Sequence, residues 1–206
     1  MKSEKITRIG IYAGTFDPVH AGHVTFALQA LKESGLDMVY FLPERRPRHK
    51  KGVEHFGHRV AMLKQAIQPH PKFSVLELDD VSFSVVRTLP SLQTRFRNSQ
   101  LVLLFGSDAI KNLPSWPRSN QLLSACELII GCRKEDNPKN IEYLIASWAD
   151  RPKSYAVLKS YAPQVSSGRI RSALQKHQPV QGILKSVERY SNKNWLYISL
   201  AVAPKR

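Results

Sequence analysis

The 206-residue sequence predicts an α/β fold, in which helices cover both faces of a parallel sheet. Three observations indicate this class. Short runs of β-branched and aromatic residues alternate with segments whose apolar residues recur every three or four positions. Several of the short runs are apolar throughout, which is typical of strands buried on both faces. No internal repeat or low-complexity linker interrupts the alternation, so we expect residues 1–206 to form a single domain.

The alternation begins with a strand, a helix and a second strand. Ile6–Ala13 is rich in β-branched and aromatic residues and runs into Gly14, which predicts a strand followed by a turn. A helix is expected from about His20, with Gly35 as its C-cap, and Asp37–Leu42 predicts the next strand. The apolar residues that define the helix are Val24, Ala27, Leu28 and Leu31.

The same pattern continues to residue 175. Further strands are predicted at Phe73–Leu78, Leu101–Phe105, Glu127–Cys132 and Ser154–Leu158. Further helices are predicted at His58–Gln68, from about Ser84, at Asn140–Trp148 and at Ser167–Gln175. Pro90 should end or kink the helix that begins near Ser84, because proline has no amide hydrogen. Pro43–Glu54 carries five Lys and Arg residues and two prolines, which predicts a mobile loop.

The composition limits the possible partners and compartment. The formal charge of +15, from 31 Lys and Arg against 16 Asp and Glu, attracts either a nucleic acid backbone or a small triphosphate. No apolar run approaches the roughly 18 residues that span a membrane. Met1–Arg8 also lacks the hydrophobic stretch of a secretory signal, so we expect a cytoplasmic protein. Cys126 and Cys132 lie about 20 Å apart in an extended segment, which predicts reduced, buried thiols and no structural zinc.

The segment between the first strand and the first helix is the most informative. It lies where an open α/β sheet presents its ligand crevice, and it reads Gly14-Thr15-Phe16-Asp17-Pro18-Val19-His20-Ala21-Gly22-His23. Gly14 lets the backbone approach a ligand, and the amides that open the helix are free donors for an anion. His20 and His23 are three positions apart, so both rings face one side. A lone histidine here would be an ordinary surface residue, but the whole segment predicts a phosphate-binding turn.

Two further segments have both a structural and a functional interpretation. Ser166 and Ser167 precede the last predicted helix, where a serine is a common N-cap. Together with the free amides and Arg171 one turn later, their hydroxyls could also bind a second anion. The basic run from Arg45 to Lys51 is either a solvated charge cluster or a set of cations that reaches over the same ligand.

The Gly14–His23 segment closely resembles the signature of the HxGH nucleotidyltransferase superfamily. It looks most like the form found in bacterial nicotinate-mononucleotide adenylyltransferases, and the resemblance extends over nearly the whole chain. The other similar segments are Pro47-Arg48-His49-Lys50, Leu103–Asp108, Leu113–Trp116, Cys132-Arg133 and Val165–Arg171.

The resemblance implies a Rossmann-like, doubly wound parallel sheet of the nucleotidyltransferase type. It also implies an adenylyltransferase that joins nicotinate mononucleotide to the α-phosphate of ATP in NAD biosynthesis and releases pyrophosphate. Mg²⁺ would be carried by the ATP phosphates, with no metal held by the protein. The residues implied in catalysis are His20, His23, Lys50 and Arg171. Those implied in ATP binding are Gly14, Thr15, Phe16, Gly106, Asp108, Arg133, Ser166 and Ser167, and those implied in acceptor binding are Ser82, Phe83, Ser84 and Trp116.

The chain departs from the family pattern at three places, and the last of them, residues 81–84, leaves the acceptor open. Gly168 replaces a Thr, Arg48 replaces the second Pro of a Pro-Pro-His-Lys segment, and residues 81–84 read Val-Ser-Phe-Ser in place of Pro-Ser-Tyr-Thr. Nicotinamide mononucleotide and phosphopantetheine are therefore alternative acceptors, and a non-catalytic nucleotide-binding or nucleic-acid-binding protein is a different class of alternative. A nucleic acid partner is not expected, because basic and aromatic residues are not interleaved along one element. The sequence does not indicate an oligomeric state.

Overall fold

The computed structural model describes residues 6–48, 50–133, 135–159 and 165–198, and within them six strands form one sheet. The strands are β1 (Thr7–Gly14), β2 (Met38–Pro43), β3 (Phe73–Val75), β4 (Ser99–Gly106), β5 (Glu127–Cys132) and β6 (Ser154–Lys159). Their order is β3-β2-β1-β4-β5-β6, and every neighbouring pair is parallel. This is the doubly wound order, so the predicted fold class is confirmed.

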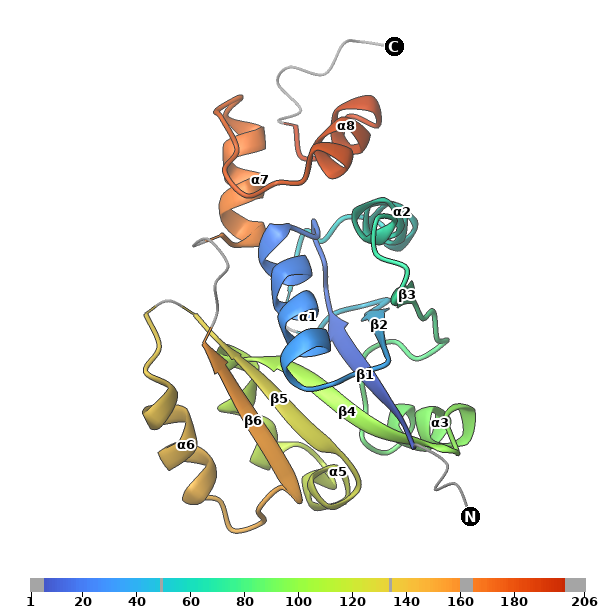
Figure 1. The fold of residues 1–206 in the computed structure, drawn as a ribbon. Coiled ribbons are helices and arrows are strands. Elements are labelled where there is room, and N and C mark those ends of the chain that lie inside the picture. The colour runs from blue at the N-terminus through green and yellow to red at the C-terminus, as the bar shows by residue number, and fades with distance from the viewer. Residues whose placement is uncertain (1–5, 49, 134, 160–164, 199–206) are drawn as a thin grey trace.

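Helices lie on both faces of the sheet (Figure 1). They are α1 (Ala21–Glu33), α2 (Phe56–Ile67), α3 (Thr88–Arg95), α4 (Ser107–Ile110), the 3₁₀ turn η1 (Leu113–Ser115), α5 (Ser119–Ala125), α6 (Pro138–Ala146), α7 (Ser167–Gln175) and α8 (Lys185–Lys193). None of these described helices combines the length and the apolar character needed to cross a bilayer.

The strands are buried on both faces because successive side chains point in opposite directions. In β4, Leu101 and Leu103 pack in a cluster with Ile9 and Ile11, whereas Val102 packs on the opposite side of the sheet. All five side chains are at most 5% exposed. The apolar runs in the sequence therefore predicted buried strands correctly, and both cysteines are likewise buried and free.

The predicted bounds hold well where the pattern is regular. Those of β5 and α7 are the predicted ones, whereas the strand predicted at Phe73–Leu78 ends at Val75. The helix expected from Ser84 begins only at Thr88, and Pro90 neither ends nor kinks it. Pro90 lies in the first turn, where a backbone amide has no partner within the helix in any case.

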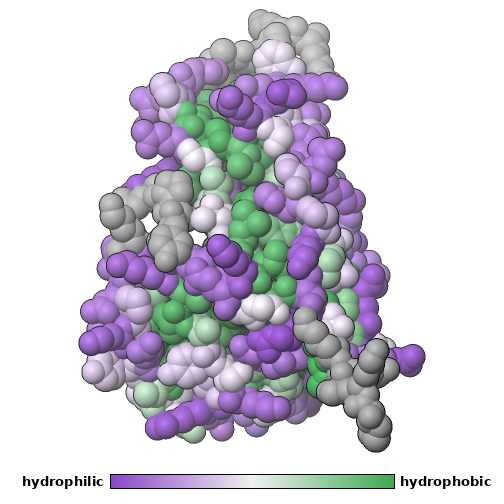
Figure 2. Space-filling model, viewed as in Figure 1, coloured by the Kyte–Doolittle hydropathy of each residue, from purple (hydrophilic) through white to green (hydrophobic). Residues whose placement is uncertain are grey.

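The buried face of α1 differs from the predicted one. Val24 and Ala27 are buried as expected, but Leu28 is 37% exposed and Phe26 is buried instead. The face that contacts the sheet is thus rotated by about one position, and Phe26 lies directly over Gly131 of β5. Figure 2 shows hydrophobic side chains reaching the surface over the middle of the molecule, surrounded by hydrophilic ones.

Four short elements were not predicted, namely α4, η1, α5 and α8. The first three contain only three to seven residues, too few for a periodic pattern. The sequence of helix α8 is almost entirely polar, and the helix buries only Val187 and Ser191. It therefore lacks the apolar pattern that predicts a helix. It nevertheless packs beside α2, and together with α7 it lies near the start of α1 (Figure 1). This places the C-terminal helices next to the turn that follows β1.

Candidate active site

A cavity of about 870 Å³ opens at the carboxyl ends of the central strands. It lies beside the neighbouring strands β1 and β4, where the strand order reverses: β2 and β3 follow on one side, and β5 and β6 on the other. This is the usual ligand site of a doubly wound fold. Every residue predicted to act in catalysis or to bind ATP lines it: Gly14, Thr15, Phe16, His20, His23, Lys50, Gly106, Asp108, Arg133, Ser166, Ser167 and Arg171. The structure therefore brings together segments that are widely separated in the sequence.

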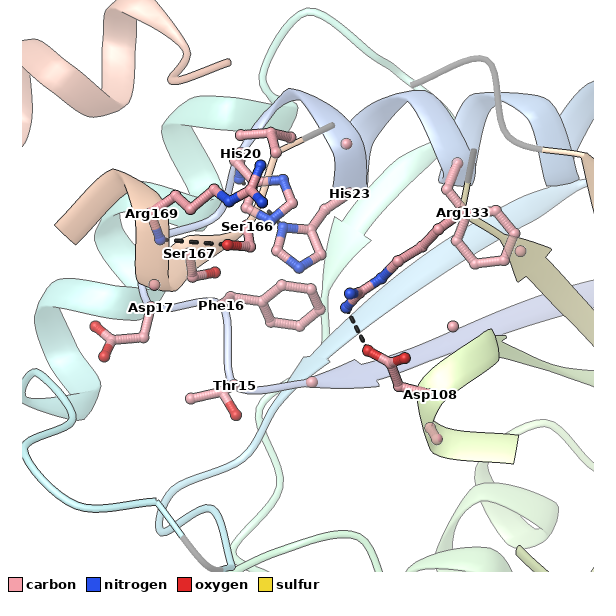
Figure 3. A pocket seen from close by; sticks show the side chains of 18 of the residues that line it. Thr15, Phe16, Asp17, His20, His23, Asp108, Arg133, Ser166, Ser167 and Arg169 are labelled. Atoms are coloured by element: carbon pink, nitrogen blue, oxygen red, sulfur yellow. Dashed lines mark hydrogen bonds and ion pairs between the residues drawn. The ribbon is translucent and has the colours of Figure 1, made fainter. Parts of the chain in front are cut away.

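The two histidines form a stacked pair at the start of α1 (Figure 3). His20 is the N-cap residue, with an extended backbone, and its amide donates to Nδ1 of His23 at 3.2 Å. The ring centroids are 3.7 Å apart, so both imidazoles face the same side, as the spacing predicted. Because Nδ1 of His23 accepts this hydrogen bond, the neutral ring carries its proton on Nε2.

Both imidazoles are neutral at pH 7. Burial, with a smaller contribution from Arg133, lowers the pKa of His20 to about 4. Burial also lowers the pKa of His23 well below its usual value, and neighbouring His20 and Lys50 lower it further. The pair therefore offers an anion N–H donors rather than positive charges. Among the described residues, the buried Nδ1 of His20 has no hydrogen-bond partner, which leaves it available to a ligand.

Gly22 between the histidines has a packing reason that the sequence analysis did not supply. A Cβ at this position would lie 3.0 Å from the His20 ring and 3.1 Å from the Val165 side chain. Only glycine lets the ring and Val165 approach α1 so closely. Gly22 thus leaves the space that the His20 ring needs in this orientation.

The turn before the histidines is held by its surroundings. Phe16 is 2% exposed and has a φ of 50°, which is costly for a bulky residue and requires firm support. Its ring lies edge-on to His23, with centroids 5.1 Å apart. Next to it, Thr15 accepts a hydrogen bond from Arg59 at its backbone oxygen (2.6 Å) and one from Lys50 at its hydroxyl (2.8 Å).

The basic loop, predicted to be mobile, is attached to the turn at both ends. Lys50 reaches Thr15, as described, and His49 lies outside the described residues. Arg59 of α2 is fully buried, and it donates to the backbone oxygens of Glu44, Arg45 and Glu54 as well as to that of Thr15. This side chain joins the phosphate turn to both ends of the loop, and the sequence gives no local sign of that role.

Asp17 is a second buried residue that the sequence analysis did not assign. It is 2% exposed and accepts a 2.7 Å hydrogen bond from the hydroxyl of Tyr197, near the end of the described chain. Burial and the neighbouring Asp17 carboxylate raise the pKa of Tyr197. Arg171 donates to the backbone oxygen of Asp17 at 2.6 Å and lies 3.6 Å from its carboxylate. These contacts fasten α7 and the C-terminal segment to the turn.

The start of α7 supports both interpretations of its serines. The hydroxyl of Ser166 accepts from the amide of Arg169 at 3.2 Å, which confirms the N-cap (Figure 3). Ser167 donates to the backbone oxygen of Pro18 at 3.0 Å, and both serines line the cavity. At Gly168 a Cβ would meet no atom within 4 Å, so the hydroxyl of the usual Thr is absent for no steric reason.

Asp108 and Arg133 form an ion pair between the ends of β4 and β5 (Figure 3). Both side chains are more than half exposed, so the pair stabilises the protein little and is open to exchange with a ligand. The backbone amide of Arg133 donates to Asp136 at 2.8 Å, which holds the start of the loop after β5. The cavity thus has an acid and a base on the wall opposite α7.

The residues predicted to bind the acceptor do not line this cavity. Trp116 lies against the rings of Phe83 and Phe105, with centroids 6.0 Å apart in each pair. Ser82 accepts from Arg48, and the amide of Ser84 donates to the hydroxyl of Thr88. Phe105 directly precedes Gly106 of the cavity wall, so the aromatic cluster of Phe83, Phe105 and Trp116 adjoins the cavity.

Comparison with known proteins agrees with this arrangement. The sequence model of the cytidylyltransferase-like family matches residues 11–173. The nicotinate-nucleotide adenylyltransferase of Bacillus subtilis (strain 168) is 33% identical over 199 residues, which cover 93% of this chain and 99% of that protein. A probable nicotinate-nucleotide adenylyltransferase of Legionella pneumophila (strain Lens) is also 33% identical, over 92% of this chain and 98% of that protein.

Solved structures share the fold. The nicotinic acid mononucleotide adenylyltransferase of Plasmodium falciparum, in its complex with NaAD, superposes with a TM-score of 0.76 at 21% identity. The superposition covers 93% of this chain and 97% of that chain. By its sequence, this chain belongs to the cytidylyltransferase-like family and, within it, to the nicotinate-nucleotide adenylyltransferases.

Proposed function

We propose that this protein transfers AMP from ATP to nicotinate mononucleotide, giving the deamido dinucleotide and pyrophosphate in a cytoplasmic step of NAD biosynthesis. One observation carries the proposal. The cavity at the switch point of the sheet brings the stacked neutral imidazoles together with Lys50 and the start of α7, in a chain 33% identical to a nicotinate-nucleotide adenylyltransferase.

The reaction needs little covalent help from the protein. An oxygen of the acceptor phosphate attacks the α-phosphorus of ATP, a new P–O bond forms, and the bond to the β-phosphate breaks with its electron pair leaving on pyrophosphate. The main difficulty is to bring two anions together and to stabilise the charge that develops. The N–H groups of His23 and His20 would donate to oxygens of the α-phosphate, where that charge increases.

The leaving group would lie between the loop and α7. Lys50, Arg171 and the free amides at the start of α7 all border the cavity and would hold the β- and γ-phosphates. The Asp108 carboxylate suits ribose hydroxyls, once its ion pair with Arg133 exchanges for the ligand.

Mg²⁺ would enter with ATP. Among the described residues there is no group of three His, Cys, Asp or Glu side chains placed to hold a metal ion. When bound, Mg²⁺ would neutralise part of the phosphate charge. Phe83 and Trp116 would contact the pyridine ring of the acceptor, with Ser82 and Ser84 beside them.

A pyrophosphate-release assay tests this function against the alternatives. We expect release from ATP only when a phosphorylated acceptor is present, whereas a non-catalytic binder would release none. Nicotinamide mononucleotide and phosphopantetheine should be included as competing acceptors, together with polynucleotide as a ligand. Turnover with phosphopantetheine alone would reassign the acceptor.

We predict that nicotinate mononucleotide is preferred over nicotinamide mononucleotide by at least about tenfold in kcat/KM, or roughly 1.4 kcal/mol. The acceptor carboxylate suits a protein with a net charge of +15, and the relatives are nicotinate-nucleotide enzymes. Steady-state kinetics with both acceptors at saturating ATP give the ratio. Equal or reversed kcat/KM values would contradict the assignment of the acceptor, but not the assignment of a nucleotidyltransferase activity.

We predict that Lys50→Ala lowers kcat/KM for ATP by about 10- to 100-fold, the effect of losing a charge-assisted hydrogen bond. Binding of the acceptor should change much less, because the ammonium group lies at Thr15 of the turn that would receive the triphosphate. ATP affinity should also fall with increasing salt in the unmodified protein and less steeply in the variant. Lys72→Ala, at an exposed position that does not line the cavity, is the matched control.

A further inference from the structure

Arg48 is held in a defined place although it lies in a basic surface loop. Its Nε donates to the hydroxyl of Ser82 at 3.0 Å, and Ser82 is only 5% exposed. The two neighbouring segments are joined at further points: the amide of Arg46 donates to the oxygen of Val81 at 2.8 Å, and that of Phe83 to the carboxylate of Glu44 at 3.3 Å. The loop therefore runs along residues 81–83, and Arg48 reaches Ser82, the residue next to Phe83 of the aromatic cluster.

The guanidinium of Arg48 has capacity left for a ligand. Nε is engaged with Ser82, but within the described residues neither terminal nitrogen has a hydrogen-bond or ion-pair partner. Two parallel N–H groups of a guanidinium match the two oxygens of a carboxylate. Because Ser82 accepts from Arg48, its own hydroxyl hydrogen also remains free to be donated.

The adjoining surface is aromatic. Phe83 follows Ser82 directly, and its ring packs against Trp116 at 6.0 Å and 44°. Phe83 is 9% exposed, so Trp116 is the ring of this pair that is open to a ligand. An aromatic surface bordered by a cation and a hydroxyl suits a planar aromatic acid. An aromatic amide of the same shape would direct N–H groups toward a guanidinium that can only donate, so it would lose the bidentate contact.

We propose that Arg48, with Ser82, binds the carboxylate on the pyridine ring of the acceptor and so determines the preference for the acid over the amide. This inference rests on the proposed function, since it names the part of the acceptor that this side chain contacts. It also gives a role to a residue at which this chain differs from the family, where a proline without charge is usual.

The experiment compares nicotinate mononucleotide with nicotinamide mononucleotide in the unmodified protein and in Arg48→Ala, Arg48→Lys and Ser82→Ala. For Arg48→Ala we expect kcat/KM for the acid to fall by about 10- to 100-fold, mainly through KM, as for loss of a charge-assisted pair. The value for the amide and the KM for ATP should change less than about twofold. Arg48→Lys should recover only part of the loss, because an ammonium group lacks the planar fork.

The matched control is Arg46→Ala, which removes an equal charge two positions away. Arg46, like Arg48, does not line the cavity, but within the described residues its side chain makes no hydrogen bond to Ser82. It should leave the ratio between acid and amide unchanged. The inference is wrong if Arg48→Ala and Arg46→Ala alter both acceptors equally, or if neither alters the ratio. Failure of the proposed function would look different, because the unmodified protein itself would then not turn over nicotinate mononucleotide.

Discussion

Replacement of His23 by alanine is expected to lower kcat by about 10² to 10³, or roughly 2.7 to 4 kcal/mol, as when one preorganised donor to developing charge is lost. The neutral ring donates from Nε2, and its partner His20 holds it by the hydrogen bond to Nδ1. KM for ATP should rise only modestly, because Ser167, Arg171 and the amides of the turn still border the triphosphate. Steady-state kinetics with both substrates give the two effects separately.

The fold should survive this substitution. His23 opens a helix at the edge of the cavity, and the core around Ile9 and Ile11 lies on the far side of the sheet. The melting temperature without ligand should therefore shift little. His70→Ala removes an imidazole that does not line the cavity, and it should retain full turnover. If folded His23→Ala turned over at a near-normal rate, the mechanism proposed for the paired imidazoles would have to be abandoned.

Replacement of Arg59 by methionine is expected to have the largest effect on stability, about 3 to 5 kcal/mol in the free energy of unfolding, because several hydrogen bonds from one charged group are lost together. Methionine fills similar space, but the backbone oxygens of Thr15, Glu44, Arg45 and Glu54 would lose a donor together. A buried carbonyl group without a partner is costly; the bond to Thr15 is fully buried, and the other three are partly buried.

Urea denaturation measures this loss. Arg97→Met, at an exposed position, is the control and should change the free energy of unfolding by less than about 0.5 kcal/mol. Remaining folded Arg59→Met protein should also show a raised KM for ATP, because Lys50 depends on the same loop. A loss below about 1 kcal/mol would mean that water replaces the guanidinium at these oxygens.

The strands could be predicted because the signal for each is local. β4 contains the apolar run 101–105 and β5 the apolar run 128–132, and such a run predicts a buried parallel strand without information from elsewhere in the chain. The predictions of helices were wrong where contacts with other segments decide whether a helix forms and where it begins. Pro90 was read as a helix breaker, yet the helix begins just before it, and α8 forms from a polar sequence because it can pack on α2.

In the candidate site, too, local features could be predicted from the sequence, whereas contacts between distant segments could not. His20 and His23 could be predicted to lie together, since three positions of one helix separate them. Arg59 and Asp17 could not be assigned, because their roles depend on partners from other segments, such as Tyr197 for Asp17. A buried charge carries no mark in the sequence that distinguishes it from an exposed one.

The contact between Tyr197 and Asp17 has a consequence for the time at which the site is completed. The two residues are 180 positions apart, and Arg171 is 154 positions from the same aspartate. Strands β1 to β5 can emerge from the ribosome and pair while these two partners of Asp17 are still unmade. The phosphate turn would therefore reach its final form only after residue 197 has been synthesised, and a nascent chain should be unable to hold ATP until α8 and the segment that carries Tyr197 have docked.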